Sequence, residues 1–179
     1  MIIEENGIRL LRLTEEHIEL VRNWRNDPKI SQFMEFRDFI TEEMQKKWFL
    51  SIDNKENYYF LIEYKHQLIG LTEIKKINFT DHSAEAGIFI YSEEYLNSMI
   101  PFQVTLSLLD FAFNYLNIVF INSYILKSNK RAIRFNKALG FVMLDAQEAI
   151  EKQHYRLFKD NFLLCTRKIR SVIKKEITL

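Results

Sequence analysis

A long apolar stretch, from Phe102 to Ile121, constrains the fold of this chain more than any other feature of its sequence. Its first part is apolar almost all round a helix, so a helix over Phe102–Leu116 should be buried on more than one side. Its second part predicts a buried strand over Val119–Leu126. The stretch does not suit a membrane span, because four polar side chains that would be costly in hydrocarbon interrupt it: Gln103, Asp110, Asn114 and Asn117.

The other elements are predicted from hydrophobic periodicity and from residues that cap or end helices. Three further helices are expected, over residues 14–27, 41–53 and 128–140. Their signals are Thr14 and Pro28, Thr41, and Ser128 or Asn129 with Gly140. Strands are expected at Ile8–Leu13, Tyr58–Tyr64, Leu68–Lys76, Ala84–Tyr91, Phe141–Leu144 and Asn161–Thr166. This order predicts a mixed sheet with helices on its faces.

The chain is expected to form one domain over residues 1–179. It contains only four Gly and two Pro, and it has neither an internal repeat nor a linker-like tract. Its net charge of +1 supplies no broad field for phosphates, so nucleic acid is not an expected partner. The single cysteine, Cys165, cannot form an internal disulfide, and the start lacks a signal-like apolar run. We therefore expect a cytoplasmic protein.

The segment S-N-K-R-A-I-R-F-N-K-A-L-G-F, from Ser128 to Phe141, resembles the cofactor-side helix motif of GNAT acyltransferases. The predicted elements that precede this motif also follow the order of that superfamily. Other segments resemble one of its branches, which contains the ribosomal-protein alanine N-acetyltransferases and the amino-sugar-nucleotide N-acetyltransferases of pseudaminic acid biosynthesis. These segments are V-R-N-W-R-N-D-P from Val21, Q-K-K-W-F from Gln45, A-E-A-G-I-F-I from Ala84 and H-Y-R-L-F-K-D-N-F from His154. The W-R-N-D-P and K-W-F pieces look closer to the sugar-nucleotide enzymes.

The resemblance implies an α/β (α+β) fold with a mixed, mostly antiparallel central sheet of about seven strands flanked by about four helices. It implies direct transfer of an acetyl group from acetyl-CoA, with no metal, to a primary amine of a small molecule. We expect this amine on an amino-sugar nucleotide. Two alternatives stay open: acetylation of a peptide N-terminus, and a non-catalytic GNAT-fold binding module with a degenerate CoA loop. The protein is expected to be a monomer or a homodimer, with no membrane partner.

Glu85 is the first candidate for the general base. A protonated amine must lose a proton before it attacks a thioester. By resemblance, Glu85 lies on the strand where the family often carries a catalytic carboxylate, and alternation places it on the same face as Gly87 and Phe89. Glu73, on the preceding strand, is the second candidate. Either glutamate is alternatively an exposed strand residue or half of an ordinary ion pair.

The resemblance places the pantetheine arm of acetyl-CoA beside the same strand, with backbone contacts from Ile88, Phe89, Ile90 and Tyr91. A backbone N–H there can polarise the thioester carbonyl. The family usually has a Gly-rich loop before the buried helix, where backbone amides hold the pyrophosphate. This chain instead has Asn97, Ser98, Met99 and Ile100, followed by Pro101, which has no N–H to donate. We therefore expect a weakened or rearranged cofactor loop.

Two asparagines of the Ser128–Phe141 segment are further cofactor-binding candidates. Asn129 is expected to contact the cofactor, to cap the helix, or to do both. Asn136 stands where many family members have a Tyr thought to protonate the departing thiolate. An amide cannot serve as that acid, which leaves water as the proton source.

Residues in the two early helices and the loop between them are candidates for binding the acceptor, since this region usually lines the acceptor pocket in the family. They are Trp24, Arg25, Asn26, Met34, Phe36 and Trp48. The helical spacing of the two tryptophans also suits core positions. The planar guanidinium of Arg25 suits a diphosphate.

The remaining reactive residues predict no further chemistry. The four histidines have no metal-ligand spacing, and no metal is expected. Cys165 is expected to be a buried strand residue. The basic segment Arg167–Lys175 is expected to be a solvated face or a packing segment.

Overall fold

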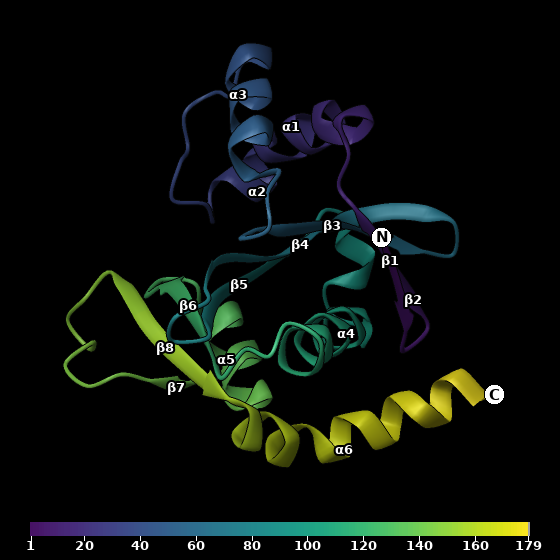
Figure 1. The fold of residues 1–179 in the computed structure, drawn as a ribbon, viewed down its shortest axis with the longest axis vertical. Helices are drawn as coiled ribbons and strands as arrows, with labels where there is room; N and C mark the ends of the chain where they lie inside the picture. Colours follow the sequence, from purple (N-terminus) through teal and green to yellow (C-terminus); the bar gives the residue numbers. More distant parts are fainter. Residues whose placement is uncertain (179) are drawn as a thin grey trace.

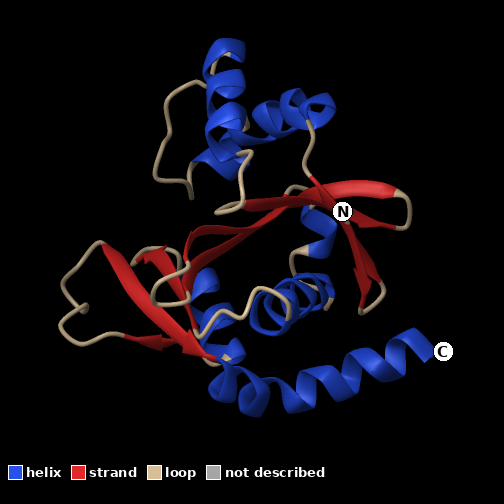
Figure 2. Cartoon of the chain, in the orientation of Figure 1, coloured by secondary structure: helices blue, strands red, loops and turns tan. Residues whose placement is uncertain are grey.

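Strands form a single eight-stranded sheet in the computed structural model, which describes residues 1–178 (Figures 1 and 2). They are β1 (Ile2–Glu5), β2 (Ile8–Arg12), β3 (Tyr58–Tyr64), β4 (Gln67–Asn78), β5 (Ser83–Ile90), β6 (Phe120–Leu126), β7 (Val142–Met143) and β8 (Lys152–Phe158). Their order across the sheet is β1-β2-β3-β4-β5-β6-β8-β7, and only β5 and β6 pair in parallel. The expected mixed, mostly antiparallel sheet is confirmed.

Helices cover both faces of the sheet (Figure 1). They are α1 (Ile18–Asn26), α2 (Pro28–Ser31), α3 (Glu42–Ile52), α4 (Ile100–Asn114), α5 (Lys130–Leu139) and α6 (Lys159–Thr178), with two 3₁₀ turns, η1 (Glu15–His17) and η2 (Glu93–Tyr95). On one face, Val21 of α1 packs with Leu61 and Leu71 in a small core to which α3 contributes. On the other face, α4, α5 and α6 build the main core. The two cores hold the sheet from both sides.

Helix α4 is the buried helix that its apolar sequence predicts. Its residues Val104, Leu106 and Leu109 are fully buried in the main core. Asp110 is one of the polar residues that interrupt the apolar stretch, and its carboxylate is paired with α6. Arg170 Nη1 and Nη2 donate to its two oxygens at 2.7 and 2.9 Å. A paired, hydrogen-bonded charge of this kind is tolerated at the edge of a core.

The sheet opens between β5 and β6 (Figure 2). These two strands pair only from Ser83 to Glu85, opposite residues 120–122. Beyond Glu85, β5 continues to pair with β4 as far as Ile90, whereas β6 pairs with β8. The strands therefore diverge, and this opening positions the candidate site.

Several local sequence signals act as predicted. Thr41 Oγ1 accepts an N–H from the first turn of α3 at 3.2 Å, and Asn129 Oδ1 does the same for α5 at 3.1 Å. Gly140 ends α5 in the left-handed conformation, with φ of 99°. The β3–β4 hairpin turns at Lys65 and His66, whose φ values of 49° and 62° are also left-handed.

The C-terminal segment differs from the prediction. The strand predicted over Asn161–Thr166 is wrong, because this range lies within α6. Its buried side chains, Phe162 and Thr166, continue to Ile173 at helical intervals. Cys165, predicted to be buried in a strand, is exposed on this helix.

The last strands of the sheet also differ from the prediction. Strand β8 was not predicted, although Gln153, Tyr155 and Leu157 alternate along it as buried residues. The polar Gln153 obscures this alternation in the sequence. Strand β1 was not predicted either, since Ile2 is exposed and β1 pairs only with β2 at the edge of the sheet.

Candidate active site

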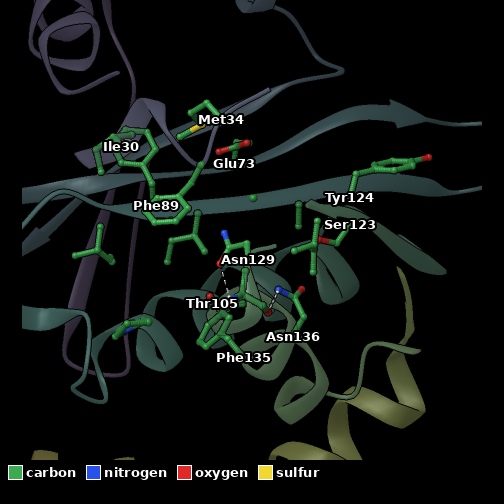
Figure 3. Close-up of a pocket in the computed structure, with 18 of the residues that line it drawn as sticks. Ile30, Met34, Glu73, Phe89, Thr105, Ser123, Tyr124, Asn129, Phe135 and Asn136 are labelled. Atoms are coloured by element: carbon green, nitrogen blue, oxygen red, sulfur yellow. Dashed lines mark hydrogen bonds between the residues drawn. The ribbon is translucent and has the colours of Figure 1, made fainter. Parts of the chain in front are cut away.

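A cavity of about 1070 Å³ occupies the opening between β5 and β6 (Figure 3). It is lined from both faces of the sheet, and we name its two parts by the helices beside them. The α1–α3 lobe is lined by residues including Arg25, Lys29, Met34, Tyr59, Glu73 and Glu85. The α4–α5 lobe is lined by residues including Thr105, Leu108, Ser123, Asn129, Phe135 and Asn136. One ligand can therefore approach another through the sheet.

Two hydrogen bonds, made by the residues directly before and after β5, show how the backbone of this strand is oriented. On the β4 side, the Tyr91 amide donates to the Ile69 carbonyl at 2.7 Å. On the β6 side, the His82 carbonyl accepts from the Val119 amide at 2.6 Å. Because successive residues of a strand turn their N–H and C=O groups to opposite edges, odd-numbered residues of β5 serve β4 and even-numbered residues serve the other edge.

This orientation divides the four residues that are expected to contact the cofactor, which are the last three of β5 and Tyr91 directly after it. Ile88 and Ile90 turn their backbone groups to the edge where β6 has already diverged. Phe89 and Tyr91 turn theirs to β4, and the Tyr91 amide is engaged there. All four line the cavity, but only Ile88 and Ile90 offer it an unpaired strand edge.

The carboxylate of Glu73 lies in the α1–α3 lobe over Gly87 (Figure 3). The two residues are cross-strand partners, and a Cβ at position 87 would come within 2.9 Å of Glu73 Cδ. Lys75 Nζ donates to Glu73 Oε1 at 3.0 Å. The Glu73 side chain is 13% exposed. A sheltered carboxylate that faces a cavity in this way can accept a proton from a bound group.

Glu85 lies at the end of the opening, where β5 and β6 are still paired. Its Oε1 accepts from Lys76 Nζ at 2.8 Å. Lys76 reaches it from an irregularity in the pairing between Lys75 and Asn78, where Lys76 takes a left-handed φ of 51°. Both candidate bases therefore line the same lobe, and each is paired with a lysine of β4.

Burial and charge shift the titration of the groups around Glu73. Burial raises the pKa of Tyr59 to about 12, and the negative charge of Glu73 adds to this shift. The same charge is the main cause that raises the pKa of Lys75. Burial lowers the pKa of Arg25, and Glu73 opposes this change. At neutral pH the Tyr59 phenol is therefore a neutral hydrogen-bond donor beside a charged cluster.

Positive charge predominates in the α1–α3 lobe. Three carboxylates that line the cavity are paired with lysines, in the pairs Glu73–Lys75, Glu85–Lys76 and Glu35–Lys152, and the lining also includes Glu93. Arg25 and Lys29 also line the lobe, and neither forms an ion pair with any residue that the structure describes. Arg25 instead lies over the Trp48 ring at 5.6 Å, and Lys29 over the Tyr91 ring at 3.6 Å. Neither cation forms a direct ion pair, so both can contact an anionic ligand, although Glu73 also acts on Arg25 at longer range.

The two asparagine candidates line the α4–α5 lobe (Figure 3). Asn129 uses its Oδ1 as the α5 cap. Asn136 donates from Nδ2 to the Ala132 carbonyl at 3.0 Å. Each amide thus keeps its other polar atom, Nδ2 of Asn129 and Oδ1 of Asn136, for a ligand.

The loop before α4 is largely closed on itself. The Ile100 amide donates to Ser98 Oγ at 3.1 Å, and the Ser98 amide donates to the Tyr95 carbonyl at 3.2 Å. The cavity lining includes Pro101 but not Asn97, Ser98, Met99 or Ile100. The start of α4 therefore offers few amides to a phosphate.

The structure separates the six acceptor candidates into two groups. Arg25, Met34 and Phe36 line the α1–α3 lobe. The others hold the lobe in shape: Trp24 is buried and stacks on Tyr91 at 5.4 Å, Trp48 packs against Tyr59 at 5.2 Å, and Asn26 exchanges two hydrogen bonds with the backbone of Ile40.

Sequence reasoning missed Tyr59, Lys75 and Lys29 as lobe residues. Period-two alternation from Glu73 would have placed Lys75 on the same face of β4. Tyr59 had no such signal, since its relation to Glu73 depends on strand pairing.

Among the described residues, no group of three or more potential metal ligands comes together, and no helix is long and apolar enough to span a bilayer.

Comparison with known families and curated proteins gives consistent matches. Residues 8–142 match the sequence model of the acetyltransferase (GNAT) domain. Acetyltransferase PseH of Campylobacter jejuni is 28% identical over 141 residues, which cover 77% of this chain and 87% of that protein. Spermidine N(1)-acetyltransferase of Escherichia coli is 24% identical over 139 residues, which cover 78% of this chain and 69% of that protein.

Solved structures match the fold. Spermidine N-acetyltransferase from Vibrio cholerae, in complex with CoA and spermine, superposes with a TM-score of 0.73 at 22% identity. The match covers 88% of this chain and 98% of that one.

Proposed function

We propose that this chain, which belongs to the acetyltransferase (GNAT) family and is an acyl-CoA-dependent N-acetyltransferase, acetylates a primary amine of an amino-sugar nucleotide. Acetyl-CoA is the proposed acetyl donor. The similarity to PseH and the W-R-N-D-P and K-W-F segments support this choice of acceptor.

The charge of the α1–α3 lobe is the observation that carries the proposal. Three of the carboxylates that line the cavity are paired with lysines, and Arg25 and Lys29 form no direct ion pair with any described residue, although Glu73 acts on Arg25 at longer range and Glu93 also lines the cavity. A polyamine carries several positive charges and would be repelled from such a lobe. A nucleotide sugar carries a diphosphate, which the planar fork of Arg25 can bind in bidentate fashion.

Glu73 is the proposed general base, and Glu85 becomes the second candidate. Glu73 faces the cavity where β5 and β6 have diverged, whereas Glu85 lies where they still pair. A substrate ammonium can hydrogen-bond to the Glu73 carboxylate and transfer its proton to it, and the neutral amine then attacks the thioester carbonyl. The C–S bond breaks as the amide forms, and CoA leaves as a thiolate that takes a proton from water. Lys75 holds the Glu73 carboxylate in position through its hydrogen bond to Oε1.

The α4–α5 lobe has the features that an acyl-CoA arm requires. The free edge of β5 at Ile88 and Ile90 can pair with the amides of a pantetheine arm, and an amide N–H there can stabilise the oxyanion that forms at the thioester. Asn129 offers its free Nδ2 beside the start of α5, where a phosphate would be favoured.

An acceptor panel tests the proposal. Purified protein with acetyl-CoA would be given a nucleotide-linked amino sugar, spermidine and a peptide with a free N-terminal alanine, and thiol release would be measured. We expect kcat/KM for the nucleotide sugar to exceed the other two by at least about tenfold, equivalent to about 1.4 kcal/mol. Preference for spermidine or for the peptide would overturn the acceptor assignment. Absence of acetyl-CoA binding in calorimetry would instead support the non-catalytic module.

A further inference from the structure

We propose that Thr105 of α4 hydrogen-bonds an amide of the pantetheine arm of acyl-CoA and so helps to hold the thioester at the free edge of β5. This inference rests on the proposed function, because it assumes that acyl-CoA occupies the α4–α5 lobe. Thr105 lies in that lobe in Figure 3, on the opposite side of β5 from Glu73.

The Thr105 hydroxyl is buried and has no partner. The residue is only 6% exposed, and Oγ1 makes no hydrogen bond with any described residue. Buried hydroxyls of other helical residues in this protein do find partners: Ser107 donates to the Gln103 carbonyl at 3.0 Å, and Thr166 donates to the Phe162 carbonyl at 2.6 Å. Thr105 therefore lacks the hydrogen bond to a backbone carbonyl of its own helix that Ser107 and Thr166 make.

The surroundings of Thr105 indicate what would satisfy it. Pro101, Thr105, Leu108 and Leu109 form one stripe of α4 that lines the cavity, and Thr105 supplies its one hydroxyl. Apolar side chains of β6 and α5, including Ile125 and Leu139, also line this lobe. A mostly apolar wall with two buried hydroxyls, those of Thr105 and Ser123, suits a ligand that is mostly aliphatic and carries an occasional secondary amide. The pantetheine arm has this chemistry, and a hydroxyl can serve either its N–H or its C=O.

The variant Thr105→Val separates ligand binding from folding, because it removes the hydroxyl and keeps the shape of the side chain. Calorimetry would measure the Kd of CoA and of adenosine 3′,5′-bisphosphate, which carries the nucleotide part of CoA without the arm. We expect Thr105→Val to weaken CoA binding about 3- to 10-fold, the effect of one net hydrogen bond, and to leave the bisphosphate unchanged. Thr105→Ser should keep CoA affinity within about twofold, because it retains the hydroxyl.

The thermal stability of the ligand-free protein gives a second readout. Since an unpartnered buried hydroxyl is unfavourable, Thr105→Val should keep or raise the Tm, by up to about 4 °C. The matched control is Thr166→Val, which removes a hydrogen-bonded hydroxyl outside the cavity lining and should lower the Tm without changing CoA affinity.

The outcomes test the role of Thr105 and the proposed function separately. Unchanged CoA affinity in Thr105→Val, an equal loss for the bisphosphate, or a lowered Tm would each overturn the role of Thr105. Failure of the unaltered protein to bind CoA would overturn the proposed function itself.

Discussion

Gly87 leaves the space that the Glu73 carboxylate occupies. The two residues face each other across β4 and β5, and a methyl group at position 87 would overlap Glu73 Oε1. The proposed base is thus positioned by a missing side chain on the neighbouring strand. Because the atoms in the way are the flexible end of a glutamate, the strand pair itself would tolerate a small side chain there.

Gly87→Ala should therefore lower kcat by at least about tenfold, because the displaced carboxylate no longer faces the amine. The Tm should change by no more than about 3 °C, which corresponds to roughly 1 kcal/mol in a chain of this size. Gly70→Ala is the contrasting variant, since its Cβ would meet the backbone carbonyl of Phe89 and should destabilise the fold. Steady-state kinetics and thermal melts check both. A fully active Gly87→Ala variant would argue against Glu73 as the base.

Glu73→Gln should lower kcat by roughly 10²- to 10⁴-fold, the usual contribution of general base catalysis, and should leave the Kd of acetyl-CoA nearly unchanged. Glu85→Gln is the matched variant on the adjacent strand, and its rate should stay within about fivefold of the parent. Both rates would be measured across pH. If Glu85→Gln carries the large loss, the base is Glu85, the first candidate from the sequence.

The raised pKa of Tyr59 predicts a loss of stability in alkali. The folded protein keeps the phenol proton up to about pH 12, whereas the unfolded chain releases it near its ordinary value of 10.0. Stability from this group is therefore fully present below pH 10 and declines above it, by roughly 3 kcal/mol in total. Urea unfolding between pH 8 and pH 11.5 should show a shallower decline in Tyr59→Phe. Tyr115→Phe, which alters an exposed tyrosine, should not change the decline.

Arg25→Ala should raise the KM for a nucleotide-linked amino sugar by about 10-fold or more, since a hydrogen bond between charged groups contributes about 1.5 to 3 kcal/mol. The KM for the free amino sugar should not change, because it has no diphosphate. Arg25→Lys should recover only part of the loss, as an ammonium lacks the planar fork. Equal effects on both substrates would remove the support for a nucleotide.

Asn129→Asp should separate the two uses of this side chain. A carboxylate still caps α5, so the Tm should be retained, but the Nδ2 donor is replaced by a negative charge and CoA should bind several-fold more weakly. Asn129→Ala should lose the cap as well, at a cost of about 1 kcal/mol in the free energy of unfolding. Melts and calorimetry together test this. Equal CoA affinity in all three proteins would limit Asn129 to capping.

The sequence determined the elements whose signals are local. The apolar run of α4, the caps Thr41 and Asn129, and the left-handed Gly140 all act within a few residues of themselves, so periodicity and residue type were sufficient to predict them. The sequence alone failed where burial contradicts the apparent pattern. Exposed Leu163 and Leu164 made the start of α6 resemble a strand, while buried Gln153 concealed β8.

Only the tertiary structure decided how the site is assembled. Strand pairing places Glu73 over Gly87 and beside Tyr59, and the divergence of β6 from β5 leaves the backbone of Ile88 and Ile90 without a partner. These relations depend on register between strands, which residue types do not specify, because a strand can satisfy its own periodicity against several neighbours. For the same reason, the sequence placed Trp24, Asn26 and Trp48 with Arg25 in one acceptor group. Packing of α1 and α3 on the sheet turned only the Arg25 side chain of these four toward the cavity.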